Sequence, residues 1–202
     1  DEKRNPSSQL LPYYGCHDTS MKIRNQIVWS SSAKQNIWTE IVTEKILKQM
    51  STLQCYVKPE YKMLKKYVDE IRPGDETNRE GHAAKVYFNA MFGKEFTREA
   101  DNAINAGLNY GYSIILSVFT REVVLNGYLT QLGLFHDNMF NPYNLACDLM
   151  EPYRPLIDRK VYQLQLEEFT HEDKMTMVNI LNEYVVINAR KEFVSNAIKI
   201  YC

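Results

Sequence analysis

A long helical pattern between Thr97 and Leu125 limits the folds that this chain can adopt. Small residues recur along it at spacings of three and four, so they share one face of a helix and allow a second helix to approach closely. They are Ala100, Ala103, Gly107 and Gly111. We therefore expect this helix to lie at the centre of a helical bundle.

The remaining sequence is also patterned mainly as helices. In the segment 35–48, apolar residues recur at helical spacing and predict a buried stripe. They are Ile37, Trp38, Ile41, Val42 and Ile46. Only 185–188 is rich enough in β-branched residues for a short strand or turn arm, and a last helix is expected from Arg190 to Cys202. With about eight helices and almost no strand, the expected fold class is mainly α, a multi-helix domain.

The chain is long enough for one domain with a substantial core, since it has 202 residues. Prolines, a glycine and serines interrupt any helical period in residues 1–19. We expect this segment to be an extended linker or arm. Residues 20–202 are then expected to form the helical domain.

Composition excludes few functions. Apolar residues make up 45% and charged residues 24%, as in ordinary soluble globular proteins. The net charge of −1 does not indicate a broadly basic surface for nucleic acid, yet it leaves room for a local basic groove. The four cysteines show no CxxC or zinc-like spacing, which fits a reducing cytoplasm. The longest apolar run, near Ile114 to Phe119, is too short to cross a bilayer.

The stretch 141–155 concentrates polar groups within an otherwise apolar segment. The asparagine and proline at its start are typical of the N-cap and the first position of a helix. In a helix that begins there, an amide and two carboxylates share one face. They are Asn144, Asp148 and Glu151. Pro152 removes the N–H that would bond the carbonyl four residues earlier, so the helix should kink beside the carboxylates.

This acidic face has two interpretations. The plainer one is a polar face in contact with solvent. The other is a cation site, which is favoured by His136 just upstream. A histidine and two carboxylates within so short a segment suit a divalent ion that accepts oxygen and nitrogen ligands, such as Mn²⁺ or Mg²⁺. Spacing alone leaves both interpretations open.

Glu80 also has two interpretations. In the segment Thr77–Glu80 it can be the acidic partner of a capping box at the start of a helix. Alternatively, it is a carboxylate at a helix N-terminus, kept ionised by the helix dipole and able to bind a cation. The sequence leaves these two roles open.

Three segments, taken together and in order, resemble a known family. They are Arg-Glu-Gly-His-Ala-Ala at 79–84, Asp-Asn-Ala-Ile-Asn-Ala-Gly-Leu-Asn-Tyr-Gly-Tyr at 101–112, and Asn-Leu-Ala-Cys-Asp-Leu-Met-Glu-Pro-Tyr-Arg-Pro at 144–155. The family is the CRISPR-associated spacer-acquisition endonuclease/integrase, the larger of the two universal adaptation proteins. Segments 26–29 and 41–46 are similar to its type II-A branch. The resemblance covers nearly the whole chain.

The resemblance implies a set of site residues. The three that it makes catalytic metal ligands are Glu80, His136 and Glu151. Asp148 matches an acidic position that supports or shares the metal site. Arg154 and Asn144 are candidate DNA contacts.

The resemblance also implies a reaction and its partners. The expected activity is a DNA endonuclease and integrase that depends on Mg²⁺ or Mn²⁺ and joins 3′-hydroxyl ends of spacer DNA to the CRISPR repeat by transesterification. The partners implied are double-stranded DNA, a small ferredoxin-like companion adaptation protein and, in the full-length family, a second copy in a homodimer.

Compared with the family, the chain is expected to lack the N-terminal β-rich domain and to end early in its last helix. The alternative interpretation is therefore a DNA-binding or scaffold module with residual nuclease activity and without the usual dimer.

Overall fold

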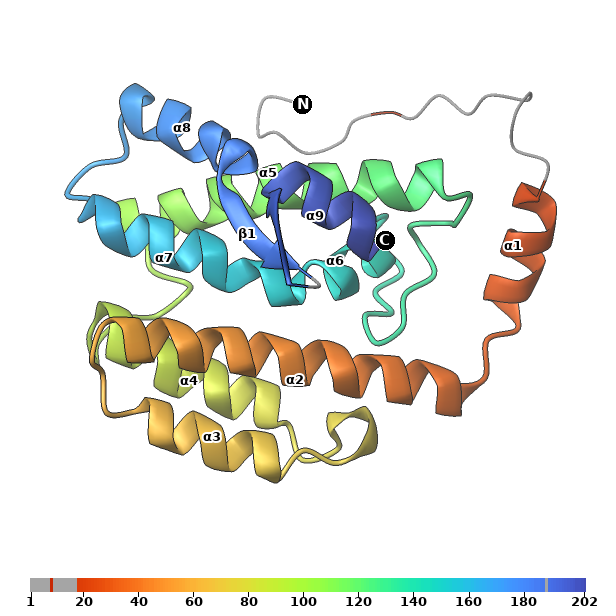
Figure 1. Ribbon diagram of the computed structural model, residues 1–202, viewed down its shortest axis with the longest axis horizontal. Helices are drawn as coiled ribbons and strands as arrows, with labels where there is room; N and C mark the ends of the chain where they lie inside the picture. The colour runs from red at the N-terminus through yellow and green to blue at the C-terminus, as the bar shows by residue number, and fades with distance from the viewer. Residues whose placement is uncertain (1–7, 9–17, 188) are drawn as a thin grey trace. The chain divides into compact units, whose positions relative to one another are not determined.

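The structure is a computed structural model that describes residues 8, 18–187 and 189–202. In these residues it holds nine α-helices, three short 3₁₀ helices and one two-stranded hairpin (Figure 1). The expected mainly α class is confirmed. The expected linker 1–19 lies almost wholly outside the described residues. Among the described helices, none has both the length and the apolar character needed to cross a bilayer.

The chain forms two compact units. The described residues of the first unit are residue 8 and those within 18–29, 109–150 and 170–202, and the second unit comprises 30–108 and 151–169. Each unit has buried apolar side chains of its own. The expectation of one helical domain over 20–202 stays a prediction.

The second unit is built on its longest helix. Its elements are α2 (Ser31–Cys55), α3 (Tyr61–Asp69), η1 (Pro73–Asp75), α4 (Arg79–Phe92), the start of α5 (Ala103–Leu125), η2 (Glu151–Tyr153) and α7 (Arg154–Leu164). Helix α2 contacts α3, η1, α4, η2 and α7, and Figure 1 shows α3 and α4 alongside it. The expected stripe on α2 is confirmed at Trp38, Ile41, Val42 and Ile46. It is wrong at Ile37, which is 44% exposed.

The long helix α5 begins at Ala103 and not at Thr97. The preceding turn does not continue the helix because the Asn105 amide donates to the carbonyl of Thr97, at 2.8 Å, and to a second carbonyl of that turn. The expected close approach of another helix is confirmed at Gly107. A Cβ atom at this position would come within 2.8 Å of the Leu166 side chain, just beyond the end of α7.

The first unit combines short helices with the hairpin. Its elements are α1 (Thr19–Ile27), the rest of α5, α6 (Asn144–Leu149), α8 (His171–Val178), η3 (Asn179–Asn182), β1 (Tyr184–Ile187), β2 (Arg190–Phe193) and α9 (Val194–Tyr201). The strand expected at 185–188 is confirmed up to Ile187, and residue 188 lies outside the described residues. The helix expected from Arg190 begins only at Val194, because Arg190–Phe193 pairs with β1 as an antiparallel strand.

Candidate functional site

Two of the expected metal ligands meet in the second unit, around one lysine. Lys45 Nζ donates to Glu80 Oε1 and, at 2.5 Å, to Glu151 Oε2. Lys45 is 6% exposed and Glu151 is 4% exposed. The Glu80 side chain is more accessible, at 28%. The structure thus gathers two carboxylates, from α4 and η2, around a buried ammonium group on α2.

Glu80 is held in place by the way that α4 begins. Asp75 in η1 accepts hydrogen bonds from the backbone N–H groups of Arg79, at 2.8 Å, and of Glu80, at 3.0 Å. The N-cap is Asn78, whose side chain accepts from the N–H of Gly81. Asp75 and Asn78 therefore satisfy the N–H groups at this helix start. The capping-box interpretation of Glu80 is wrong, and its carboxylate is instead used on Lys45.

Glu151 lies where the helical path is broken. Helix α6 ends at Leu149, η2 follows, and α7 begins at Arg154, so the break expected beside the carboxylates is confirmed. The N-terminal end of the prediction is wrong, because α6 starts at Asn144 and not near residue 141. Arg154 Nε donates to Glu151 Oε1 at 2.8 Å. Each oxygen of the Glu151 carboxylate therefore accepts from a cationic side chain.

Neighbouring positive charges lower the pKa of Glu151 even though the carboxylate is buried. Burial acts to raise the pKa of Glu151, but the positive charges of Lys45 and Arg154, with their hydrogen bonds, lower it to about 2. Burial likewise acts to lower the pKa of Lys45, yet the carboxylates of Glu151 and Glu80 outweigh it and leave that pKa raised. Glu151 and Lys45 are both ionised at neutral pH.

Lys45 is the residue of the candidate site that the sequence analysis missed. It follows Ile41 by four residues and Val42 by three, so it lies on the buried face of α2. A lysine on such a face needs a buried anionic partner. The position of Lys45 on the buried face of α2 was the sequence signal that could have identified it. It does not indicate which acidic residues would contact the lysine.

In the first unit, Asp148 holds the loop that carries His136. Asp148 is fully buried. Its carboxylate accepts from the backbone N–H groups of Leu134 at 2.6 Å, and of Phe135 and His136 at 3.1 Å each. Its Oδ1 also lies 2.6 Å from Nδ1 of His136, whose side chain is 40% exposed. Asp148 thereby sets both the path of the loop and the direction of the imidazole.

The same loop packs closely against α6 because of Asn144 and Gly133. Asn144 is 3% exposed, and its amide donates to the carbonyls of Gln131 and Asn138 at 3.0 Å each. A Cβ atom on Gly133 would collide with the His136 carbonyl oxygen and come within 2.8 Å of Asp148 Oδ2. Asn144 thus braces the loop. Its DNA contact stays a prediction, as does that of Arg154.

The expected ligands fall into two pairs. Glu80 and Glu151 meet in the second unit, and His136 and Asp148 meet in the first. Within the part of the chain that the structure describes, no group of three or more His, Cys, Asp and Glu side chains forms a ready metal cluster. The three-ligand site of Glu80, His136 and Glu151 stays a prediction.

Comparison with known proteins assigns the family. Residues 13–197 match the family described as CRISPR associated protein Cas1. This chain belongs to the Cas1 family. It is 41% identical over 170 residues to the CRISPR-associated endonuclease Cas1 of Neisseria meningitidis serogroup C (strain 8013), covering 81% of this chain and 54% of the relative. It is 30% identical over 125 residues to a CRISPR-associated endonuclease Cas1 of Pyrobaculum aerophilum, covering 55% and 42%.

The chain spans about half the length of the curated relatives it matches. Solved structures share the fold at lower identity. A casposase bound to integration product superposes with a TM-score of 0.73 at 20% identity, over 98% of this chain and 70% of the other. A CAS1 protein from Thermotoga maritima gives a TM-score of 0.69 at 18% identity, over 96% and 70%. The resemblance to the Cas1 family is confirmed, and the type II-A branch stays a prediction.

Proposed function

We propose that this chain carries the catalytic part of a metal-dependent DNA endonuclease and integrase of CRISPR adaptation. The observation that carries the proposal is the pair Glu80 and Glu151, gathered around the buried Lys45. Two neighbouring carboxylates, one of them buried, are costly unless positive charge compensates them, so such a pair is typical of a place that binds cations. The endonuclease names of the Cas1 relatives support this interpretation.

The donor groups suit Mg²⁺ or Mn²⁺. Glu80 and Glu151 offer carboxylate oxygens, and His136 offers an imidazole nitrogen. In the neutral tautomer whose Nδ1–H donates to Asp148, the lone pair of the imidazole is on Nε2, the arrangement common in metal-bound histidines. The mixed oxygen and nitrogen set favours Mn²⁺ somewhat over Mg²⁺. When bound, such an ion polarises the scissile phosphate and stabilises negative charge on the departing 3′ oxygen.

The residues of the chain then have distinct roles. Glu80, His136 and Glu151 would hold the ion, and Asp148 orients His136. Lys45 supplies the positive charge that the carboxylate pair requires before an ion binds. Arg154, anchored on Glu151, is placed at the start of α7, where it is a candidate for contact with a DNA phosphate.

The reaction proposed is a transesterification. A 3′-hydroxyl of the incoming DNA attacks a phosphorus atom of the repeat and forms a new phosphodiester bond. The bond from that phosphorus to the old 3′ oxygen breaks, and the hydroxyl proton is balanced by the proton taken up at the departing oxygen. One phosphodiester replaces another, so no water is consumed and no covalent enzyme intermediate is needed.

The partners proposed are double-stranded DNA and a small companion adaptation protein. Two observations support them, and both concern proteins of the same fold. One is the casposase bound to integration product. The other is a partial Cas6-RT-Cas1–Cas2 complex, which superposes with a TM-score of 0.78 at 17% identity over 99% of this chain and 73% of the other.

A gel assay on branched and duplex DNA tests the activity. We expect cleavage with Mn²⁺ or Mg²⁺, none with EDTA, and loss of at least about a hundredfold in rate for Glu151→Gln, the scale of a lost electrostatic contribution to the transition state. Glu44→Gln is the matched control, because Glu44 is an exposed carboxylate on α2. DNA binding without metal-dependent cleavage would instead support the binding or scaffold module.

A further inference from the structure

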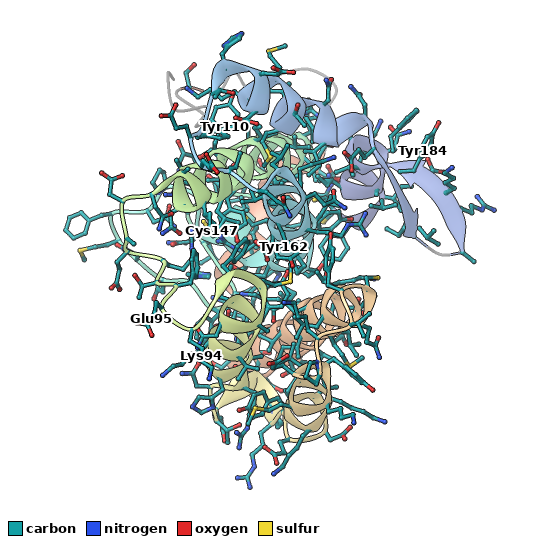
Figure 2. All side chains as sticks on the ribbon, turned by 90° about the vertical axis from the view of Figure 1, so that its left-hand side faces the viewer. Lys94, Glu95, Tyr110, Cys147, Tyr162 and Tyr184 are labelled. Carbon is teal, nitrogen blue, oxygen red and sulfur yellow. The ribbon has the colours of Figure 1, made fainter. Side chains whose placement is uncertain are left out.

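One face of the hairpin β1–β2 consists of exposed side chains. In its register Tyr184 pairs with Phe193, and Val186 pairs with Lys191. Side chains alternate between the two faces of a strand, so these four share one face. All four are exposed, with Tyr184 at 55% and Val186 at 70%. Figure 2 shows Tyr184 on this hairpin, which extends outward from α8 and α9 of its own unit.

This face combines stacked aromatic rings with positive charge. The rings of Tyr184 and Phe193 stack with their centroids 4.5 Å apart and an interplanar angle of 24°. Lys191 Nζ lies 4.2 Å from the centroid of the Tyr184 ring. Arg190 is also exposed, but it pairs with Ile187 and so lies on the opposite face of the hairpin. The only carboxylate of the two strands, Glu192, pairs with Val185 on the opposite face and is half-buried.

An exposed aromatic pair of this kind is costly to a protein unless something covers it, because apolar surface in water is unfavourable. The lysine on the same face distinguishes between occupants. A purely apolar partner would bury the charge of Lys191 without compensation. A nucleic acid supplies a flat base for the rings and a phosphate for the lysine.

We propose that this hairpin face is a binding surface for single-stranded or frayed DNA. Tyr184 and Phe193 form the stacking platform for an unpaired base, and Lys191 binds the adjoining phosphate. Stacking needs a base whose face is open, so a fully paired duplex fits the surface less well. The choice of DNA rests on the proposed function.

The test is fluorescence anisotropy in EDTA, which separates binding from metal-dependent cleavage. The probes are a labelled single-stranded oligonucleotide and a blunt duplex of the same sequence. We expect the double variant Tyr184→Ala with Lys191→Ala to raise the Kd for the single strand at least about tenfold, the scale of one lost base stack and one lost phosphate contact. The Kd for the duplex should rise less.

Two controls separate the platform from general effects. Tyr184→Phe keeps the ring and should bind as the wild type does. Lys65→Ala removes an exposed lysine on α3 of the second unit and should change the Kd less than threefold. Circular dichroism and metal-dependent cleavage at saturating DNA check that the double variant is folded.

An unchanged Kd in the double variant, or a loss no larger than that of Lys65→Ala, would overturn the inference. So would unchanged DNA binding together with a change of oligomeric state in sedimentation, which would make the face a protein contact. If the wild type shows no metal-dependent cleavage but the hairpin variant still loses single-strand binding, the proposed function fails and the binding surface stands.

Discussion

At the scale of single residues, the positive charge of Lys45 compensates the two carboxylates of the candidate site. Its ammonium group is the hydrogen-bond donor common to Glu80 and Glu151, and Arg154 contributes a second cation to Glu151. Removing one member of a buried ion pair leaves an uncompensated charge, which costs more than the pair itself contributes. The ionised side chains of Lys45, Glu80 and Glu151 therefore depend on one another for charge compensation.

Lys45→Met is expected to destabilise the protein by about 3–5 kcal/mol, the usual cost of breaking a buried ion pair from one side. Urea unfolding measures it. Addition of Mn²⁺ should restore part of the loss, because the ion replaces the missing positive charge. Lys48→Met, on the exposed face of the same helix, is the control. A loss below about 1 kcal/mol would show that the carboxylates do not depend on Lys45.

The depressed pKa of Glu151 predicts a pH dependence of stability. The folded protein has a pKa of about 2 at Glu151 against an ordinary value of 4.5. The unfolded chain thus binds the proton more readily, and the stabilisation is complete above pH 4.5 and is lost as the pH falls toward 2. The amount is on the order of 3 kcal/mol.

Urea unfolding of the wild type and of Glu151→Gln from pH 7 down to pH 2.5 tests this dependence. The difference in unfolding free energy between the two proteins should be largest at pH 7 and should shrink below pH 4.5. A difference that stays constant over this range would contradict the ionised pair with Lys45.

At the scale of elements, one helix start and one loop position the candidate ligands Glu80 and His136. The N-terminus of α4 is fixed by Asp75 and Asn78, which directs Glu80 to Lys45. The loop before α6 is wrapped around the carboxylate of Asp148, which directs His136. In both cases a side chain that satisfies backbone N–H groups determines where a neighbouring functional group lies.

Gly133→Ala is expected to disturb the loop without affecting the core, because its Cβ meets the His136 carbonyl and the Asp148 carboxylate. We expect a loss of stability of about 1–3 kcal/mol, the usual cost of overpacking. Hydrogen exchange should show faster exchange at the amides of Leu134 and His136. Gln131→Ala, at an exposed position of the same loop, is the control. Unchanged protection in Gly133→Ala would mean that the loop relaxes without releasing Asp148.

At the scale of the whole molecule, the predicted metal site requires residues that are distant in the sequence. The ligands that the resemblance implies are Glu80, His136 and Glu151. Their chain positions are far apart, so binding of one ion by all three is a long-range property. A paramagnetic ion tests it, because it broadens the NMR signals of nearby nuclei.

Titration of the ¹⁵N-labelled protein with Mn²⁺ is expected to broaden the amide signals of Gly81 and His136 together, at the same metal concentration. Mg²⁺, which is diamagnetic, should shift these signals without broadening them. Glu151→Gln should weaken both effects. Broadening confined to Gly81 would contradict the three-ligand site and leave an ion bound by the two carboxylates alone.

Local patterns predicted much of the fold. The mainly α class and the break beside Pro152 follow from helical periodicity and from the missing N–H of proline, which act within a few residues. The same rules misplaced the last helix, because the residues from Arg190 to Phe193 are compatible with either structure. Their pairing with β1 decided between the two.

The sequence by itself named the candidate ligands through the resemblance to the Cas1 family, whereas spacing alone left the polar-face and capping-box interpretations open. Only the tertiary structure decided how they are held. Lys45 is 35 residues from Glu80 and 106 from Glu151, and no local rule selects partners at such distances. Lys45 becomes buried only when α2, α4 and η2 pack together. Because a buried charge needs compensation, the lysine then requires the two carboxylates.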